Sequence, residues 1–328
     1  MAEKKTVLSG MRPTGPLHLG HLAGALRNWL QLQDQYQCFY TIVPWHALSS
    51  EYQNSKSIKG FTYEYALGWL SFGLDPEKSV LFVQSEVKEH AELHLLLSMI
   101  IPLPWLQRVP TFKEAQREVT DRDLNTYGFL GYPVLQTADI VIYKANYVPV
   151  GEDQAFHLEL AREIVRKFNS LFKPVFPEPQ ILLTEVPKLA GTDGRKMSNS
   201  YGNTINLDDS PDMIRKKIAP MKTDTRRKRK TDPGEPDDCP VFTLHKAFVE
   251  EEKREYLAQG CRTAGIGCLE CKNVVIDYIN ELLSPYRDKK RKYEKDPKLV
   301  WDILEEGNKK ARKVAQETME EVRAAIGI

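Results

Sequence analysis

The stretch Thr14–His21, with the sequence TGPLHLGH, joins a short apolar segment to a region of helical character. Residues 5–9 before it are expected to form a buried strand, and residues 21–30 after it carry apolar side chains at helical spacing. A glycine-rich turn lets a ligand approach the backbone, and unpaired N–H groups at a helix start suit phosphate. His18 and His21 can donate hydrogen bonds to phosphate oxygens. The stretch therefore indicates a phosphate-binding corner; the alternative is a chance His-x-Gly-His at a helix start.

Apolar segments and helical segments alternate through the first half of the chain. Strands are expected at 38–43 and 80–84, and helices at 55–72, closed by Gly73, and at 89–100. This alternation predicts an α/β fold with a doubly wound, Rossmann-type parallel sheet. Ligands in such sheets bind beyond the carboxyl ends of the strands, and the turn after the first strand lies at such an end.

Residues 102–123 interrupt this pattern with prolines, Trp105 and a polar run. We interpret them as an insertion between the two halves of the sheet, either an irregular surface segment or a contact surface for a partner subunit or a nucleic acid. After Tyr201 the strand-like runs give way to helical patterns. We therefore expect a Rossmann-type domain over residues 1–205 and an all-helical domain over residues 206–328.

Asp139 is the one carboxylate in the apolar run 130–143, which is expected to be helical. Burying a carboxylate is unfavourable unless something binds it. Asp139 is therefore either on an exposed face of the helix or a hydrogen-bond acceptor at the floor of an apolar pocket.

Two glycine-containing loops follow this helix. Gly151–Gln154, with the sequence GEDQ, stands at a predicted strand-to-helix junction, where a carboxylate suits ribose hydroxyls. The same sequence is also an ordinary helix start. Residues 191–200, with the sequence GTDGRKMSNS, form a glycine-rich loop with a pair of cations. The alternative for this second loop is a mobile basic surface loop.

Four of the five cysteines lie close together in the sequence: Cys239, Cys261, Cys268 and Cys271. The last three have the spacing C-x6-C-x2-C. Four thiolates can bind zinc or an iron–sulfur cluster, and unligated buried cysteines are the alternative. Zinc ribbons more often carry two short C-x2-C pairs, and this set has one. Cys38 is expected to be a core residue of the second strand.

The overall composition fits a soluble, cytoplasmic protein. The formal net charge is +1 with 28% charged residues, so nucleic-acid contacts would be local patches. No apolar run approaches the roughly 20 residues of a membrane span, and the N-terminus lacks the apolar core of a signal peptide. The basic block 226–230 precedes an acidic turn at 232–238. It is either a solvated charge run or a phosphate-contact segment.

The phosphate corner and the lysine loop together resemble the signatures of class I aminoacyl-tRNA synthetases. Thr14–His21 resembles their HIGH motif, with Leu19 in place of isoleucine, and residues 191–200 resemble their KMSKS loop. Asn199 stands where that loop has its second lysine. A neutral amide can donate a hydrogen bond but supplies no charge, so the role of this position stays open.

Three further stretches resemble the bacterial tryptophanyl-tRNA synthetases, at residues 9–15, 138–143 and 148–154. The cysteine pattern resembles that of the members of this family that carry a [4Fe-4S] cluster. The resemblance implies activation of tryptophan by ATP, with Mg²⁺, and transfer of the tryptophanyl group to tRNA(Trp) by a homodimer. A tyrosyl-tRNA synthetase is disfavoured, because Leu8–Gly10 stands where that relative places a tyrosine near the substrate hydroxyl. A synthetase-like RNA-binding protein without catalysis and a small-molecule nucleotidyltransferase are further alternatives.

The resemblance also implies residue roles. Asp139 accepts the indole N–H, and Lys196 holds the leaving pyrophosphate. The implied catalytic residues are His18, His21 and Lys196. The implied ATP contacts are Arg12, Pro13, Thr14, Gly20, His21, Gly151, Glu152, Asp153, Lys196, Met197 and Ser198. The implied tryptophan contacts are Asp139, Tyr132, Gln154, Gln136 and His46. The implied metal ligands are Cys239, Cys261, Cys268 and Cys271.

Overall fold

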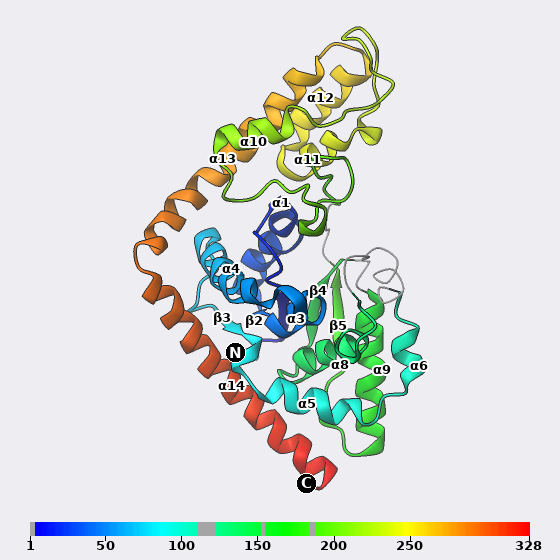
Figure 1. Ribbon diagram of the computed structural model, residues 1–328, viewed down its shortest axis with the longest axis vertical. Coiled ribbons are helices and arrows are strands. Elements are labelled where there is room, and N and C mark those ends of the chain that lie inside the picture. The colour runs from blue at the N-terminus through cyan, green and yellow to red at the C-terminus, as the bar shows by residue number, and fades with distance from the viewer. Residues whose placement is uncertain (1–3, 111–122, 152–154, 184–187) are drawn as a thin grey trace. The chain divides into compact units, whose positions relative to one another are not determined.

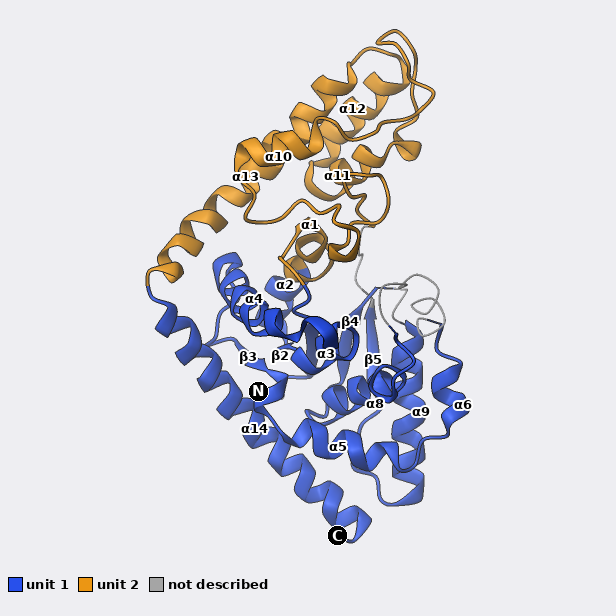
Figure 2. Ribbon diagram, viewed as in Figure 1, with its two compact units in different colours: residues 1–14, 28–184, 296–328 blue, residues 15–27, 185–295 orange. Residues whose placement is uncertain are grey.

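The computed structural model describes residues 4–110, 123–151, 155–183 and 188–328 of the chain (Figure 1). The chain divides into two compact units (Figure 2). The first unit comprises Met1–Thr14, Asn28–Thr184 and Asp296–Ile328, and the second comprises Gly15–Arg27 and Glu185–Lys295.

The first unit is built on one five-stranded sheet in the order β3-β2-β1-β4-β5, with every paired strand parallel. The strands are β1 (Thr6–Met11), β2 (Gln37–Ile42), β3 (Ser79–Val83), β4 (Tyr147–Val150) and β5 (Gln180–Leu183). The chain runs outward from β1 to β3 and then returns to the other side of β1. This order confirms the predicted doubly wound sheet, and its switch point lies between β1 and β4.

The strands are buried on both faces, as their unbroken apolar sequences predict. Phe39 and Phe82 are 2% and 0% exposed, and their rings meet edge to face at 6.5 Å. Tyr143 stacks on Phe39 with the ring centroids 4.7 Å apart. Each fully buried side chain of this size stabilises the fold by about 1.5–3 kcal/mol relative to exposure, so the aromatic cluster holds β2, β3 and the end of α8 together.

Helices surround this sheet. Among the described residues, the α-helices that lie wholly in the first unit are α3 (Pro44–Glu51), α4 (Ile58–Phe72), α5 (Glu89–Ser98), α6 (Leu103–Gln107), α8 (Tyr127–Val141), α9 (Ala155–Leu171) and α14 (Pro297–Ile326). Gly73 ends α4 in the left-handed conformation, with φ at 106°, as predicted from its position. The expected insertion at 102–123 contains α6, and its residues 111–122 lie outside the described part of the chain.

Helix α14 covers the edge of the sheet along β3. A methyl group at Gly307 would lie 1.8 Å from the carbonyl oxygen of Leu81, so only glycine permits this approach. The Val83 N–H on the same strand donates to Oδ1 of Asn308 at 2.8 Å. These contacts satisfy and shield backbone groups that an edge strand otherwise exposes.

The second unit is mainly helical. Its described helices are α1 (Leu19–His21), the π-helical turn Leu22–Leu26, the 3₁₀ turns Asn199–Tyr201 and Pro236–Asp238, α10 (Pro211–Ile218), α11 (Pro240–Phe248), α12 (Glu251–Arg262) and α13 (Cys268–Glu294), and α2 (Arg27–Gln35) begins in it. Phe242, Leu257 and Ile266 form a small core, with Cys239 and Cys271 packed against it. No described helix in either unit is long and apolar enough to cross a membrane.

These units differ from the division expected at residue 205. The second unit starts earlier and also includes residues 15–27, and α14 belongs to the first unit instead of the helical part. A helical pattern gives the apolar face of α14 but not the surface on which that face packs. The close contact through Gly307 is what joins α14 to the sheet.

Candidate active site

The phosphate corner forms a compact, self-bonded turn in the second unit. His18 is the N-cap of α1, and its Nδ1 accepts the Gly20 N–H at 3.1 Å. The His18 N–H in turn donates to Nδ1 of His21 at 3.2 Å, and the two ring centroids are 3.9 Å apart. A side chain at Gly20 would meet the His18 ring at 2.8 Å, which explains the glycine. These contacts fix both imidazoles against the backbone.

Both imidazoles are neutral near pH 7. Burial lowers the pKa of His18 to about 4. Burial, with the neighbouring His18, also lowers the pKa of His21 well below its ordinary value. Since each Nδ1 accepts a backbone N–H, the ring proton of each histidine is assigned to Nε2. The corner therefore presents two neutral N–H donors, which suits phosphate oxygens without adding charge.

The corner is held by the segment that follows the lysine loop. The Leu19 N–H donates to the Ile205 carbonyl at 3.0 Å, and the Leu207 N–H donates to the Leu17 carbonyl at 2.9 Å. A short antiparallel pairing between residues 17–19 and 205–207 results. The two motifs are far apart in the sequence, but they are neighbours within one unit.

The lysine loop is organised by Asn203 and Asp193. The Asn203 side chain donates to Oδ1 of Asp193 at 2.7 Å and to the Lys196 carbonyl at 3.1 Å. The hydrogen bond from Asn203, followed by those from Arg195, lowers the pKa of Asp193 to about 2. Met197 is buried, at 5% exposure, while Lys196 is exposed. The loop thus holds its backbone fixed and presents the lysine to solvent.

Asn199, whose role the sequence left open, bonds to the phosphate corner. Its Nδ2 donates to the Pro16 carbonyl at 3.1 Å. A methyl group at Gly15 would lie 2.7 Å from the Asn199 side chain, so the two residues are in close contact. Asn199 therefore acts as a neutral bridge between the two motifs.

Asp139 is the centre of a buried polar network in the first unit. It is 3% exposed, which excludes the exposed face considered for it. Its Oδ2 accepts Nε2 of Gln84 at 2.6 Å and is 3.0 Å from Nε2 of His46. Its Oδ1 is 2.6 Å from Nδ1 of His90. Burial alone would raise the pKa of Asp139, but its interactions with His90 and His46 outweigh burial and lower that pKa. The carboxylate is ionised and firmly oriented.

Other residues expected at the tryptophan site lie near this carboxylate. Tyr132, Gln136 and Asp139 occupy one face of α8, because they are spaced four and three residues apart. The Tyr132 hydroxyl is 2.6 Å from Nε2 of His157, and the Tyr132 and His46 rings are 6.4 Å apart. Gln154 lies outside the described residues.

The residues expected at the ATP site divide between the units. Arg12, Pro13 and Thr14 follow the carboxyl end of β1, and Gly151 follows that of β4, on either side of the switch point. Arg12 donates to the Ser50 hydroxyl at 2.8 Å. The second unit contains Gly20, His21, Lys196, Met197 and Ser198. Glu152 and Asp153 lie outside the described part of the chain.

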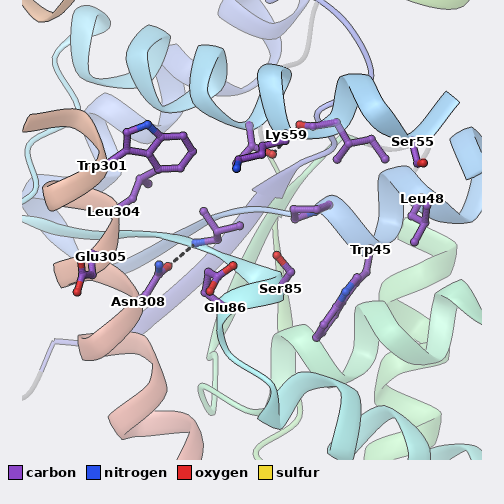
Figure 3. A pocket seen from close by; sticks show the side chains of 14 residues that line it. Trp45, Leu48, Ser55, Lys59, Ser85, Glu86, Trp301, Leu304, Glu305 and Asn308 are labelled. Carbon is purple, nitrogen blue, oxygen red and sulfur yellow. Dashed lines mark hydrogen bonds between the residues drawn. The ribbon is translucent and has the colours of Figure 1, made fainter. Parts of the chain in front are cut away.

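A cavity of about 640 Å³ lies elsewhere in the first unit, with two indole rings among its walls (Figure 3). It is lined by residues from α3, α4, the end of β3 and α14, including Trp45, Lys59, Glu86 and Trp301. None of the residues expected to bind tryptophan or ATP lines it. The Trp45 backbone N–H, however, donates to Oε1 of Gln84 at 3.2 Å and so fixes the amide that bonds to Asp139.

The four clustered cysteines line one small cavity in the second unit, of about 20 Å³. Cys239 precedes α11, Cys261 lies in α12, and Cys268 and Cys271 lie in the first turn of α13. All four are free thiols, and burial raises the pKa of Cys271 to about 12. Among the described residues, no group of three or more His, Cys, Asp and Glu residues is arranged so that it could hold a metal ion.

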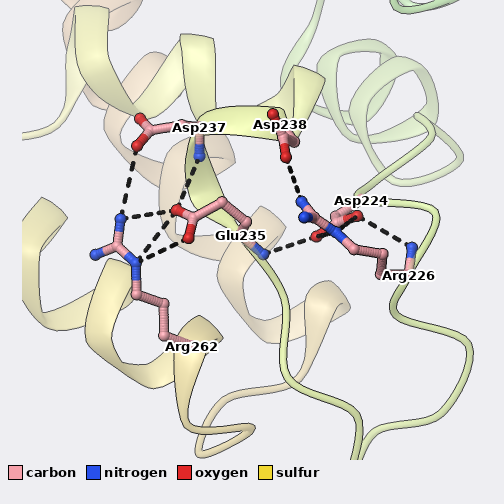
Figure 4. A network of polar contacts seen from close by, with 6 residues as sticks. All are labelled: Asp224, Arg226, Glu235, Asp237, Asp238 and Arg262. Carbon is pink, nitrogen blue, oxygen red and sulfur yellow. Dashed lines mark hydrogen bonds and ion pairs between the residues drawn. The ribbon is translucent and has the colours of Figure 1, made fainter.

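The charged block beside these cysteines is largely paired (Figure 4). Arg226 is 2.9 Å from Oδ1 of Asp224 and also bonds to Asp238, and Arg262 is 2.8 Å from Oε1 of Glu235. Arg227 lies 3.7 Å from the Cys261 sulfur. Part of the basic run and the acidic turn thus bond to the folded unit instead of forming one solvated stretch.

The sequence reasoning missed Gln84, His90 and Tyr143 as members of the Asp139 network. Gln84 directly follows β3, and a polar residue at the carboxyl end of a parallel strand is a recognisable signal. His90 gave no such signal, because only the packing of α5 on α8 brings it to Asp139, and Tyr143 joins the network only through its bond to His90.

A family model for class I tRNA synthetases (W and Y) matches residues 1–284. The sheet, the phosphate corner and the lysine loop agree with that match. The chain belongs to the class I aminoacyl-tRNA synthetases.

Relatives of known function identify the branch of this class. A tryptophan–tRNA ligase from Thermotoga maritima is 54% identical over 324 residues, which cover 98% of this chain and 99% of the relative. A tryptophan–tRNA ligase from Ralstonia nicotianae is 43% identical and covers 98% of each chain. The crystal structure of tryptophanyl-tRNA synthetase from Campylobacter jejuni, complexed with ADP and tryptophan, has a TM-score of 0.85 and 34% identity. It covers 98% of this chain and 100% of that one. Within its class, the chain belongs with the bacterial tryptophanyl-tRNA synthetases.

Proposed function

We propose that this chain is a tryptophan–tRNA ligase that works in two steps. The tryptophan carboxylate attacks the α-phosphate of ATP and releases pyrophosphate, and the terminal ribose of tRNA(Trp) then accepts the tryptophanyl group. The observation that carries the proposal is the 54% identity to a tryptophan–tRNA ligase over nearly the whole chain. ATP with Mg²⁺ is expected throughout the family, with the ion accompanying the phosphates.

The first step needs positioning and charge stabilisation more than covalent chemistry. We assign His18 and His21 to the phosphate oxygens, because both rings are neutral donors at Nε2. We assign Lys196 to the charge that develops on the departing pyrophosphate, because it is an exposed cation on a loop whose backbone is fixed. Gly20 leaves room for adenine against the backbone, and Gly151 and Asp153 are assigned to the ribose.

We assign the indole N–H of tryptophan to Asp139. The support is an ionised, buried carboxylate on α8 that accepts hydrogen bonds from several side chains. Tyr132 and Gln154 are assigned to the ammonium group, and Gln136 and His46 complete the set.

The protein is proposed to be a cytoplasmic homodimer, since charging of tRNA takes place there. An exposed apolar series at α5 and α6 supports the dimer: Leu95, Met99 and Leu103 are 53%, 71% and 58% exposed. They follow one another at intervals of four residues, and a second copy of the chain is the proposed cover.

We further propose that Cys239, Cys261, Cys268 and Cys271 bind a [4Fe-4S] cluster, with one zinc ion as the alternative. The support is a set of four thiols that line one cavity, which is a donor set suited to either metal. The four thiols are not arranged as a metal site in the described part of the chain, so binding of either metal requires them to move. When bound, the metal would join α11, α12 and α13.

Metal analysis of protein purified without oxygen separates these alternatives. About four irons per chain, with the absorption of an iron–sulfur centre, are expected. One zinc and no iron per chain would show that the site binds zinc instead of a cluster. The absence of both metals would show that the four thiols are unligated. Cys271→Ser should lower the metal content, whereas Cys38→Ser, in β2, should not.

Exchange of labelled pyrophosphate into ATP, measured with each standard amino acid, tests the activity. Tryptophan alone should support exchange. Exchange with tyrosine would favour a tyrosyl-tRNA synthetase, and no exchange with any amino acid would favour a non-catalytic RNA-binding protein. Asp139→Asn should raise the tryptophan KM or lower kcat by about tenfold or more while the KM for ATP changes little, because a hydrogen bond to a charged group is lost.

A further inference from the structure

We propose that His90 and Tyr143 are positioning residues that hold Asp139 as the acceptor for the indole N–H and so set the selectivity for tryptophan. The inference rests on the proposed role of Asp139. It goes beyond that role because neither residue is assigned to the tryptophan or ATP contacts.

The three side chains form one buried chain of hydrogen bonds. The Tyr143 hydroxyl is 2.6 Å from Nε2 of His90, and Nδ1 of His90 is 2.6 Å from Oδ1 of Asp139. Their exposures are 2%, 0% and 3%, so water does not compete for these bonds. His90 lies in the first turn of α5, whereas Asp139 and Tyr143 come from α8 and the turn after it. This series of hydrogen bonds therefore ties the Asp139 carboxylate to a second helix.

The donor and the acceptor in each of these hydrogen bonds follow from the two end residues of the series, Asp139 and Tyr143. Asp139 is ionised and can only accept, so Nδ1 of His90 must carry a proton. Burial, with the charges of Asp139 and Glu89, raises the pKa of Tyr143 well above its ordinary value, so its hydroxyl stays protonated. We assign the hydroxyl as the donor to Nε2, which leaves the single proton of a neutral His90 ring on Nδ1. Tyr143 thus selects the tautomer in which His90 donates to Asp139.

The rings have little freedom to rotate away. Phe39 stacks on Tyr143 at 4.7 Å, and Phe82 meets Tyr143 at 5.3 Å and His90 at 6.1 Å. These aromatic neighbours come from β2 and β3, so the sheet supports the hydrogen-bonded side chains of Tyr143 and His90. Because the His90 ring is held in place, its bond to Oδ1 also fixes the orientation of the Asp139 carboxylate.

The occupancy of the Asp139 oxygens leaves a defined place for the substrate. A carboxylate has about four acceptor positions. Among the described residues, Oδ2 faces Gln84 and His46, and Oδ1 faces His90 alone. The His90 bond orients the carboxylate and so fixes the direction of the remaining acceptor position on Oδ1. A ligand without an N–H there leaves one acceptor position of a buried carboxylate without a donor, which is unfavourable.

A substrate that lacks the indole N–H provides the test. In β-(3-benzothienyl)alanine sulfur replaces the N–H, so Asp139 gains nothing from it. We expect His90→Leu to lower kcat/KM for tryptophan in pyrophosphate exchange by about 10- to 100-fold and that for the analogue by less than about threefold. His90→Asn, whose amide nitrogen can replace Nδ1, should recover most of the discrimination. The KM for ATP should not change.

Tyr143→Phe tests the end of the hydrogen-bonded series that is farther from Asp139, and it disturbs the packing less. It keeps the ring and its packing, and we expect it to reduce the discrimination by about threefold to tenfold. Tyr40→Phe is the matched control, because the Tyr40 hydroxyl is also buried but bonds to the Trp29 carbonyl at 3.0 Å. This control should leave the ratio between the two substrates unchanged.

Equal losses for both substrates in His90→Leu would overturn the proposal, because that result indicates a structural role only. The ¹⁵N spectrum of His90 in the unaltered protein gives an independent check. It should show a protonated Nδ1, and an unprotonated Nδ1 would also overturn the proposal. If Asp139→Asn itself leaves the discrimination intact, the proposed role of Asp139 fails; if only the His90 variants do so, this inference alone fails.

Discussion

His18 links the chemistry of single residues to the stability of the whole unit. Its pKa falls from 6.5 to about 4 on folding, because the ring is buried. The unfolded chain therefore binds a proton at this position more readily than the folded chain does between these pH values. The stability from this group is complete above pH 6.5 and is lost as the pH falls through about 4.

We predict that the free energy of unfolding decreases between pH 6.5 and pH 4, with up to about 3 kcal/mol of that decrease from His18. Urea unfolding at several pH values in this window measures the slope. His18→Gln removes the titrating group and should flatten the curve relative to the unaltered protein. An identical slope in the variant would contradict the assignment to His18.

Asn199 gives a second prediction at the scale of one side chain. Asn199→Asp keeps the shape but replaces the N–H₂ donor by an oxygen that repels the Pro16 carbonyl. We expect the rate of adenylate formation to fall about tenfold or more, because the bond between the lysine loop and the phosphate corner is lost. The exposed neighbouring variant Ser200→Ala should retain the rate. Full activity of Asn199→Asp would show that the bridge is dispensable.

At the scale of elements, the sequence predicts the type of structure better than the partner of each element. The strands at 38–43 and 80–84 and the helix closed by Gly73 were predicted nearly in place, because unbroken apolar runs and a left-handed glycine are local signals. The packing of α14 on β3 was not predicted, because a helical period contains no information about the partner. The same limit applies to the Asp139 network. The sequence identifies Asp139 as a carboxylate in an apolar run, but it does not show that His90, on another helix, bonds to it.

Gly307 tests the contact between α14 and β3. A side-chain methyl would lie 1.8 Å from the Leu81 carbonyl oxygen, so the helix has to move away from the strand. We predict that Gly307→Ala lowers the free energy of unfolding by about 3 kcal/mol or more, as expected for overpacking against backbone. Thermal or denaturant unfolding provides the measurement.

Gly60→Ala is the matched control for this prediction. Gly60 also lies inside a helix, α4, but a methyl group there would meet nothing within 4 Å. The higher helix propensity of alanine should then stabilise the protein by up to about 1 kcal/mol. If both variants behaved alike, the close approach at Gly307 would have no energetic weight.

At the scale of the whole molecule, the exposed apolar series at Leu95, Met99 and Leu103 predicts self-association. Met99→Glu introduces a charge into the proposed dimer surface, and burying it there is unfavourable. We expect sedimentation velocity at micromolar concentration to show a dimer for the unaltered protein and mainly monomer for the variant. Met213→Glu, on α10, should remain dimeric. A monomeric unaltered protein, or an unaffected dimer in Met99→Glu, would exclude this surface.

The position of α14 in the chain also has a consequence for synthesis. The helix that covers the β3 edge lies after the entire segment 185–295 in chain order, although it packs on a strand that ends at Val83. A growing polypeptide therefore makes β3 more than two hundred residues before Gly307 and Asn308 can reach it. During that interval the uncovered edge is open to pairing with other nascent chains. The ribosome-bound intermediate, rather than the finished enzyme, is where this fold is most exposed to misassembly.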